Sequence, residues 1–441
     1  MRLDRRFALT CVFLYAVAQV LFLINIDTPK GLNFDESHYV PAAWQLLDGR
    51  PDPNREHPPL GKMLIAAGIA FAGNRPLGWR VMSTVFGSLT LVGMYVWGVA
   101  LFKDRALALW AALVTLANHL LYVQARIGML DTFMFAFLVW ASAAVIAALD
   151  PTLQPKRAHL YLGTAGLMLG LAMAAKWFAI VGWTACLGLV LSVRFVERYS
   201  RTFASRDAAR SFMVRERSLT TWDVTRCLVL YPLLAYAVCF LPRLVAEHQG
   251  SWYGAPLDLV QMHVRMYEAQ RNVPGQHPYM SQWYQWPFLT RPIWYAFERD
   301  GARVRGVLLL GNPLVMWAGM VALVFCAIDV VRRRSSTFAK ATADTRAALL
   351  IVFFYLAFFA SWIVIPRRLS LYYYYYPAAM TLSLALAYAL RDRASRVSYR
   401  WARWTLLAAA AAVFIYFLPV LSGSPIGKDE FMKWMWFPAW I

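Results

Sequence analysis

The sequence FALTCVFLYAVAQVLFLINI, residues 7 to 26, is followed shortly afterwards by NFDESHY, residues 33 to 39. An apolar run of about 20 residues is long enough to cross a bilayer as a helix. Such runs recur along the whole chain of 441 residues, of which 60% are hydrophobic and 15% charged. A soluble protein of this length would need more charge to cover its surface. The sequence therefore predicts an all-α polytopic membrane protein with a polar loop after its first span.

Applied along the chain, the length criterion predicts about eleven transmembrane helices. They are 8–26, 79–101, 106–125, 128–149, 159–176, 177–196, 227–246, 307–330, 347–365, 369–390 and 404–422. With the N-terminus in the cytoplasm, the cytoplasmic segments are 1–7, 102–105, 150–158, 194–226, 331–346 and 391–403. These segments hold more than half of the 44 Lys and Arg, as the positive-inside rule requires.

This topology leaves two large non-cytoplasmic loops, 27–78 and 247–306, and a tail, 423–441. We expect one membrane domain over residues 1–441, with no separate soluble domain. The net charge of +20 does not indicate a nucleic-acid partner, because the basic residues fall in short loops where they set topology. The five cysteines show no CxxC spacing, so neither a zinc site nor a disulfide is expected.

The second large loop begins with Leu257, Val260, Val264 and Tyr267 at helical spacing, which predicts an amphipathic helix on the membrane surface. Residues 277–287 follow, and their Trp and Tyr side chains suit headgroup depth. We interpret the tyrosine run 372–376 as further rings near a membrane face.

The first large loop holds the carboxyl groups with the strongest claim to chemistry. Asp35 and Glu36 are adjacent, and near a membrane such a pair needs stabilisation. They are either a general base with a neighbour that orients an acceptor, or a solvated pair. Glu56 and His57 precede two prolines, and Lys62 then enters an apolar segment, as part of a site or as a loop end with a snorkelling lysine.

Ionisable residues within or beside the spans are the other candidates, because charge at that depth is costly and usually lines a polar cavity. Arg80, Arg126 and Lys176 are cations suited to a lipid-linked phosphate. Arg126 and Asp131 are equally well interpreted as an ion pair that locks two spans together. Arg367 and its neighbour are either loop charges or a further phosphate clamp. No nucleotide-binding or metalloprotease motif accompanies these residues, so the energy for a transfer would come from an activated lipid donor.

These residues form a collinear set of motifs that resembles the protein O-mannosyltransferases, a family with the GT-C fold. The motifs are FDESHY (34–39), EHPPLGK (56–62), WR (79–80), RIGMLD (126–131), AKW (175–177), HPYMSQW (277–283), WP (286–287), RPIW (291–294), GNP (311–313) and YYYYYP (372–377). The resemblance extends over nearly the whole chain. It implies an inverting transferase that moves a sugar, in this family mannose, from a dolichyl- or polyprenyl-phosphate donor to Ser or Thr hydroxyls.

The resemblance also implies roles for individual residues. Asp35 would be the base, and Glu36 would help to hold the acceptor or the sugar. Donor-phosphate ligands would be Arg80, Lys176, Arg126 and Arg367. The residues lining the site would be His57, Glu56, Lys62, Asp131, His277, Tyr279 and Arg291. No metal and no other cofactor is expected.

The shortness of 247–306 leaves no room for the extra domain of eukaryotic members, so we expect a bacterial inner-membrane enzyme with a periplasmic site. Its expected partners are the lipid donor, the bilayer and a secreted or periplasmic protein. A lipid or polysaccharide acceptor is the alternative, and a dimer stays open. A transporter is a third possibility, which the lack of internal symmetry disfavours.

Overall fold

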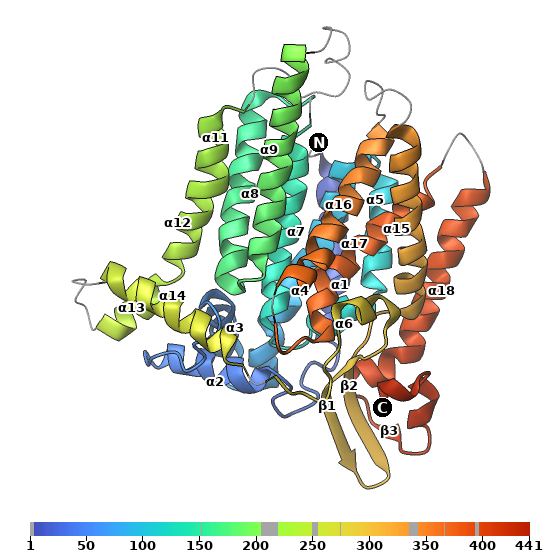
Figure 1. The fold of residues 1–441 in the computed structure, drawn as a ribbon. Helices are drawn as coiled ribbons and strands as arrows, with labels where there is room; N and C mark the ends of the chain where they lie inside the picture. Colours follow the sequence, from blue (N-terminus) through green and yellow to red (C-terminus); the bar gives the residue numbers. More distant parts are fainter. Residues whose placement is uncertain are drawn as a thin grey trace.

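The structure is a computed structural model that describes residues 4–150, 152–203, 219–248, 255–273, 275–334, 343–365, 367–392 and 397–441. Parts of the predicted cytoplasmic segments, 204–218, 335–342 and 393–396, lie outside the described residues. The chain is predominantly helical, as predicted, and its long helices run side by side in one bundle (Figure 1). The α-helices are α1 (Arg5–Leu23), α2 (Glu36–Leu47), α3 (Leu60–Ala72), α4 (Pro76–Phe102), α5 (Arg105–Leu116), α6 (His119–Gln124), α7 (Leu130–Ala148), α8 (Pro155–Ala175), α9 (Ala179–Phe203), α11 (Thr221–Thr225), α12 (Tyr231–Val238), α13 (Leu241–His248), α14 (Ala255–Arg271), α15 (Pro313–Arg334), α16 (Ala343–Val364), α17 (Tyr376–Ala389) and α18 (Val397–Ser422). Three strands complete it: β1 (Ile293–Asp300), β2 (Arg303–Leu309) and β3 (Ile426–Gly427).

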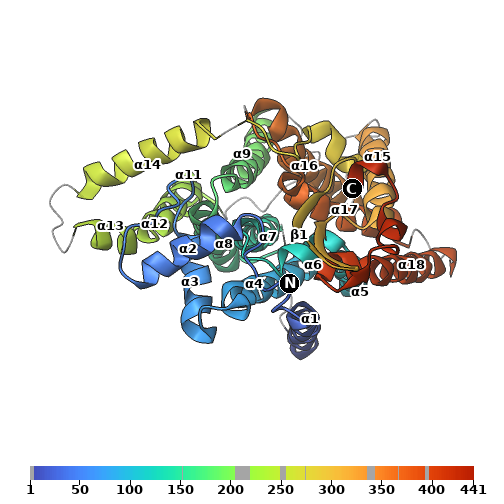
Figure 2. The same cartoon turned by 90° about the horizontal axis from the view of Figure 1, so that it is seen from below.

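Seven of the described helices are long and apolar enough to cross a membrane: α1, α4, α7, α8, α15, α16 and α18. Each coincides with a predicted span. Most of α4 and α7 is buried, whereas α1 and α18 lie at edges of the bundle and expose many apolar side chains (Figure 2). This distribution is typical of a helix bundle whose outer surface contacts lipid tails.

Three of the other four predicted spans are interrupted, and in the fourth, α9, only residues 179–195 are apolar, so the count of eleven crossings stays a prediction. Span 106–125 is divided into α5 and α6 because Asn118 interrupts it, its side chain accepting a hydrogen bond from the Leu120 N–H at 3.2 Å. Span 227–246 begins with a π-turn, Arg226–Leu230, just before Pro232, and breaks again between α12 and α13. The apolar part of α9 is short, and 369–390 contains a 3₁₀ turn before α17.

A small antiparallel sheet, in the order β1-β2-β3, departs from the all-α prediction. Residues 307–309, which we predicted to begin a span, belong to β2, and the helix starts only at Pro313. The apolar run from Val307 to Leu310 is buried in a strand and a short connection, and hydrophobicity alone does not distinguish such a run from the start of a helix.

The predicted amphipathic helix is present as α14. Its four predicted apolar residues are all exposed, from 51% for Val264 to 63% for Leu257. On the other side of the helix Met262 and Met266 are buried in a small cluster with Phe240 and Leu244. The helix therefore packs on α13 with one face and leaves a second apolar face uncovered.

Candidate active site

The elements that carry the predicted site residues gather at one end of the bundle. Helices α2, α3 and α14 and the β1–β2 hairpin all lie at the lower end in Figure 1, opposite the N-terminus. Figure 2, the view from below, shows α2 and α3 beside α8, and β1 near the centre. The two predicted non-cytoplasmic loops therefore meet, although residues 79–246 separate them in the sequence.

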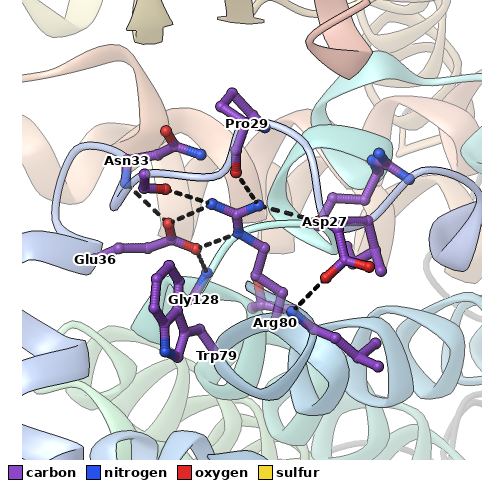
Figure 3. A network of polar contacts seen from close by, with 12 residues as sticks. Asp27, Pro29, Asn33, Glu36, Trp79, Arg80 and Gly128 are labelled. Carbon is purple, nitrogen blue, oxygen red and sulfur yellow. Dashed lines mark hydrogen bonds and ion pairs between the residues drawn. The ribbon is translucent and has the colours of Figure 1, made fainter. Parts of the chain in front are cut away.

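Glu36 and Arg80 form a buried ion pair at the base of this end (Figure 3). The Arg80 Nε donates to Glu36 Oε1 at 2.9 Å, and its Nη2 donates to Oε2 at 3.0 Å. The remaining guanidinium hydrogen bonds go to the carbonyl oxygens of Ile26, Pro29 and Gly31. Glu36 also accepts from the backbone N–H groups of Asn33 and Gly128, each at 2.9 Å.

These hydrogen bonds use all the N–H groups of the Arg80 guanidinium. The side chains of Arg80 and Glu36 are also fully buried. Neither residue lines the cavity described below. The predicted roles, donor-phosphate binding for Arg80 and acceptor or sugar binding for Glu36, do not fit this placement. The pair instead joins the loop after α1 to α4 and to the start of α7.

Arg126 is also occupied within the protein. Its guanidinium donates to the carbonyl oxygens of Phe22 and Asn25, at 2.7 and 3.0 Å, and to that of Ile24. The last carbonyls of a helix lack intrahelical partners, and a cation at that end complements the helix dipole. Arg126 thus caps α1 and does not pair with Asp131, which corrects the interpretation of these two residues as an ion pair.

Asp131 pairs with Lys176. The Lys176 Nζ donates to Asp131 Oδ2 at 2.7 Å, and both side chains are almost fully buried. The ammonium group also lies 4.8 Å from the ring centre of Tyr373 and 5.6 Å from that of Tyr374. A carboxylate and two aromatic faces compensate for removing this cation from water.

Asp35 lies directly before α2, and the chain turns sharply there because Phe34 adopts a left-handed conformation, with φ of 49°. The half-buried Asp35 carboxylate accepts a hydrogen bond from the Tyr39 hydroxyl at 3.2 Å. Burial raises the pKa of Asp35, while the nearby Lys176 ammonium opposes that rise. Asp35 thus combines a raised pKa with an available oxygen, as a general base requires.

A second polar network connects the first loop to α14. The Gln270 Nε2 donates to the Glu56 carbonyl oxygen at 2.7 Å and contacts His57 Nδ1 at 3.2 Å. Arg367 donates from Nη2 to Gln270 Oε1 at 2.8 Å, and its guanidinium stacks 4.9 Å from the Tyr374 ring centre. Burial, followed by the nearby cations, holds the pKa of His57 well below its ordinary value, so the ring is neutral.

Lys62 and the Glu56 carboxylate have local roles in this loop. Lys62 is buried and donates to Asp52 and to the carbonyl oxygens of Asn54 and His57, the last at 2.9 Å. Glu56 accepts from the Asn54 side chain at 2.9 Å. The predicted placement of these two side chains in the lining of the site is not seen, since the cavity lining does not include them.

A cavity of about 750 Å³ opens beside these networks. Four cations line it: Lys176, Arg271, Arg367 and Arg368. His57, Gln270 and Tyr374 border it, and none of the described residues that line it carries a carboxylate. An apolar wall from the start of α9, the end of α16 and the residues next to them includes Phe178, Ile180, Val181, Trp362 and Ile365. A cavity with this division suits an anionic head group attached to an apolar chain.

The predicted residues of the second loop lie near Phe34, the residue before Asp35, and none of them lines this cavity. The ring of Phe34 lies 5.6 Å from that of His277 and 4.9 Å from that of Tyr295, measured between ring centres. Arg291 lies 6.0 Å from the ring centre of Tyr279 and donates to the Pro278 carbonyl oxygen at 2.8 Å. The Tyr279 ring lies 5.6 Å from that of His277, so these two rings continue the aromatic contact that begins at Phe34, and Arg291 packs against Tyr279.

Several residues of the site were not predicted. Gln270 lies at the end of the amphipathic helix α14, and nothing in that sequence pattern indicates that it connects Glu56 and Arg367. Tyr39 belongs to the motif quoted first, and its spacing of one helical turn from Asp35 was an available signal. The tyrosine run 372–376, predicted at a membrane face, is buried instead, and Tyr373 and Tyr374 face the Lys176 ammonium.

The helix bundle, with a charged cavity at the end where two long loops meet, has the architecture of the membrane-embedded glycosyltransferases called GT-C. Among solved structures, the chain is similar to the protein O-mannosyltransferase Pmt1-Pmt2 complex of S. cerevisiae bound to the sugar donor, with a TM-score of 0.81 and 15% identity over 100% of this chain and 93% of that one. It is also similar to ArnT from Cupriavidus metallidurans bound to undecaprenyl phosphate, with a TM-score of 0.59 and 18% identity over 93% of this chain and 64% of that one.

Sequence comparison identifies the family. Residues 12–244 match the family model for dolichyl-phosphate-mannose-protein mannosyltransferase, and residues 257–440 match that for the C-terminal four-helix membrane region of protein O-mannosyltransferases. A polyprenol-phosphate-mannose–protein mannosyltransferase of Mycolicibacterium smegmatis is 27% identical over 99% of this chain and 94% of its own length. The chain belongs to the protein O-mannosyltransferase family.

Proposed function

We propose that this protein transfers mannose from a polyprenyl-phosphate donor to Ser or Thr hydroxyls of proteins at the non-cytoplasmic membrane face. The observation that supports it best is the position of Asp35. The ring of Phe34, the residue before Asp35, lies 6.1 Å from the Tyr373 ring, and the Lys176 ammonium lies 4.8 Å from that same Tyr373 ring. Lys176 in turn lines a cationic cavity with an apolar wall. A base and a site for an anionic leaving group therefore adjoin each other, as a displacement at a sugar carbon requires.

The proposed step is a single displacement. The Asp35 carboxylate accepts the proton of the Ser or Thr hydroxyl while the hydroxyl oxygen attacks the anomeric carbon of the sugar. The bond from that carbon to the phosphate oxygen breaks, and the polyprenyl phosphate departs with the electron pair. One base and one direct attack invert the configuration at the anomeric carbon, in agreement with the expectation from the family resemblance.

The cations of the cavity would stabilise the departing phosphate. Of the four predicted phosphate ligands, Lys176 and Arg367 line the cavity, whereas Arg80 and Arg126 are occupied elsewhere. Arg271 and Arg368 line the same cavity. Charge that develops on the phosphate oxygens would be matched by fixed cations in a partly dehydrated cavity, where such interactions are strong.

Replacing Arg367 with methionine is expected to raise the KM for the lipid-phosphate sugar by roughly ten- to a hundred-fold, since a charge-assisted hydrogen bond to phosphate is lost. The measurement is transfer of labelled sugar against donor concentration. Lys30→Met is a matched control, because Lys30 is an exposed cation of the first loop that lies outside the cavity. Equal donor KM values for the two variants would show that Arg367 does not bind the donor phosphate.

The activity is expected to fall on the acid side with a midpoint above 3.8, the ordinary value for an aspartic acid, because burial raises the pKa of Asp35. Below its pKa the carboxyl keeps its proton and cannot accept one from the acceptor. The check is kcat/KM against pH in detergent, with folding monitored at each pH. A constant kcat/KM down to a pH of about 4 would contradict this assignment.

The experiment that tests the function supplies the purified protein with polyprenyl-phosphate mannose and a Thr-containing peptide, and identifies the product by mass spectrometry. We expect peptide carrying one mannose. The alternative acceptor is a lipid, which the fold likeness to ArnT keeps open. Mannose found on added envelope lipid and not on peptide would overturn the proposal of a protein acceptor.

A further inference from the structure

The hairpin of β1 and β2 has one covered edge and one open edge. The tail covers the β2 side: β3 pairs with Arg303 and Val304, and the Gly423 N–H donates to the Gly306 carbonyl oxygen at 3.1 Å. Within the described residues no strand pairs with the other side of β1. Proteins usually pair, cover or otherwise protect a strand edge, because its free N–H and C=O groups bind further strands.

The strand register shows which groups are available at the open edge. Residues of an antiparallel pair alternate between hydrogen-bonded and non-hydrogen-bonded positions. The Gly306 carbonyl points toward the tail, so its partner Phe297 is at a non-hydrogen-bonded position of the β1–β2 pair. The N–H and C=O of Phe297 therefore point away from β2, and by the same alternation those of Arg299 do so as well. Phe297 is 38% exposed, and Arg299 is exposed too.

The end of β1 that precedes this open edge lies close to the Asp35 loop. Tyr295 lies two residues before Phe297, about 7 Å along the strand. Its ring packs on that of Phe34, the residue before Asp35, with 4.9 Å between the ring centres. In Figure 1, β1 is the strand on the side of α2, and β2 and the C-terminus lie on the other side.

The C-terminal tail anchors the hairpin through tryptophan hydrogen bonds. The Trp294 Nε1 donates to the Trp440 carbonyl oxygen at 2.9 Å, and the Trp440 Nε1 donates to the Leu289 carbonyl oxygen at 2.7 Å. A side chain at Gly306 would collide with the Trp294 ring, 2.3 Å from the Cβ position. The C-terminal tail thus fixes one side of the hairpin and leaves the other side presented at the site.

We propose that the acceptor polypeptide docks as an additional extended strand on the open edge of β1. It hydrogen-bonds to the main chain of Phe297 and Arg299, and its Ser or Thr reaches Asp35 beyond Tyr295. The proposal rests on the protein acceptor of the proposed function and adds how that acceptor is bound. Main-chain pairing provides affinity without reading side chains, so the extended conformation of the acceptor, and not its sequence, would determine binding.

The test uses the unaltered full-length protein and a short synthetic peptide with one central Thr among Val and Ala. In a series of peptides each backbone amide in turn is N-methylated, which removes one N–H. Alternate positions of a strand face β1, so N-methylation is expected to raise the peptide KM roughly ten-fold at every second position. The intervening positions are the matched controls.

Arg299→Pro is the complementary change in the protein, because it removes one N–H from the open edge and leaves the β1–β2 hydrogen bonds. We expect a similar rise in peptide KM with an unchanged donor KM. Should this variant not fold, the peptide series decides alone.

Each outcome has one meaning. A peptide KM that rises at every second N-methylated position supports docking of the acceptor as a strand. Transfer that is insensitive to N-methylation, or equally sensitive at every position, overturns it while leaving the proposed function intact. Absence of transfer to the unmodified peptide, with mannose delivered to lipid, overturns the proposed function and the docking strand together.

Discussion

Replacing Asp35 with asparagine is expected to lower sugar transfer by two to four orders of magnitude, the usual contribution of a general base. Asparagine keeps the shape of the side chain and can still accept a hydrogen bond from the Tyr39 hydroxyl, which lies 3.2 Å from Asp35 Oδ2. It cannot accept the proton of the attacking hydroxyl. The protein should accumulate in the membrane at its normal level, because the hydrogen bond from Tyr39 is preserved and the half-buried position no longer holds a charge.

The measurement is kcat in purified material, with thermal unfolding followed in parallel. Asp48→Asn is the matched control, since Asp48 lies exposed at the other end of α2. We expect that control to transfer sugar at the normal rate. Near-normal transfer by Asp35→Asn would exclude Asp35 as the base and direct attention to Asp131, the other carboxylate near Lys176.

Replacing Arg80 with methionine is expected to reduce stability by about 3–5 kcal/mol, because the Glu36 carboxylate is then left buried without a counter-ion. Such a loss is a large part of the roughly 5–15 kcal/mol by which a protein domain is stable. The carbonyl oxygens of Ile26, Pro29 and Gly31 would lose their donor as well. We expect low accumulation and a reduced unfolding temperature.

Two further variants test whether the loss of stability comes from the unpaired Glu36 charge. Arg75→Met removes an exposed arginine one residue before α4 and should change stability by at most about 0.5 kcal/mol. Adding Glu36→Gln to Arg80→Met removes the stranded charge and keeps an acceptor for the Gly128 N–H, so part of the stability should return. If Glu36→Gln alone lowered kcat at normal stability, Glu36 would act on the substrate, and its role would not be the structural one of neutralising Arg80.

Local patterns were sufficient for many features of this protein. The seven long apolar helices and α14 follow from runs and periodicities within about 20 residues of one another. The motif around Asp35 and the family resemblance likewise depend on neighbouring residues. These features were predictable because each is determined by the residues of one segment.

The assignment of charges was less predictable, since it depends on partners far along the chain. Arg80, Arg126 and Lys176 have the same appearance in the sequence: a lone cation at the end of an apolar run. Only the tertiary structure shows that Arg80 pairs with Glu36 and that Arg126 donates to the carbonyls that end α1. It also shows that Lys176 pairs with Asp131 and lines the cavity. A buried cation adopts whichever partner offsets its desolvation, and sequence spacing does not show that partner.

The loop at residues 33–39 shows both sides of this division. Its residues alone determined that a pair of carboxylates follows the first span, in a motif that resembles one family. The structure separated the two: Glu36 points into the bundle and is neutralised by Arg80, while Asp35 remains half-buried beside Tyr39. The physical reason is helix geometry, because adjacent residues at a helix start project in different directions, and only packed neighbours decide which direction meets a cation.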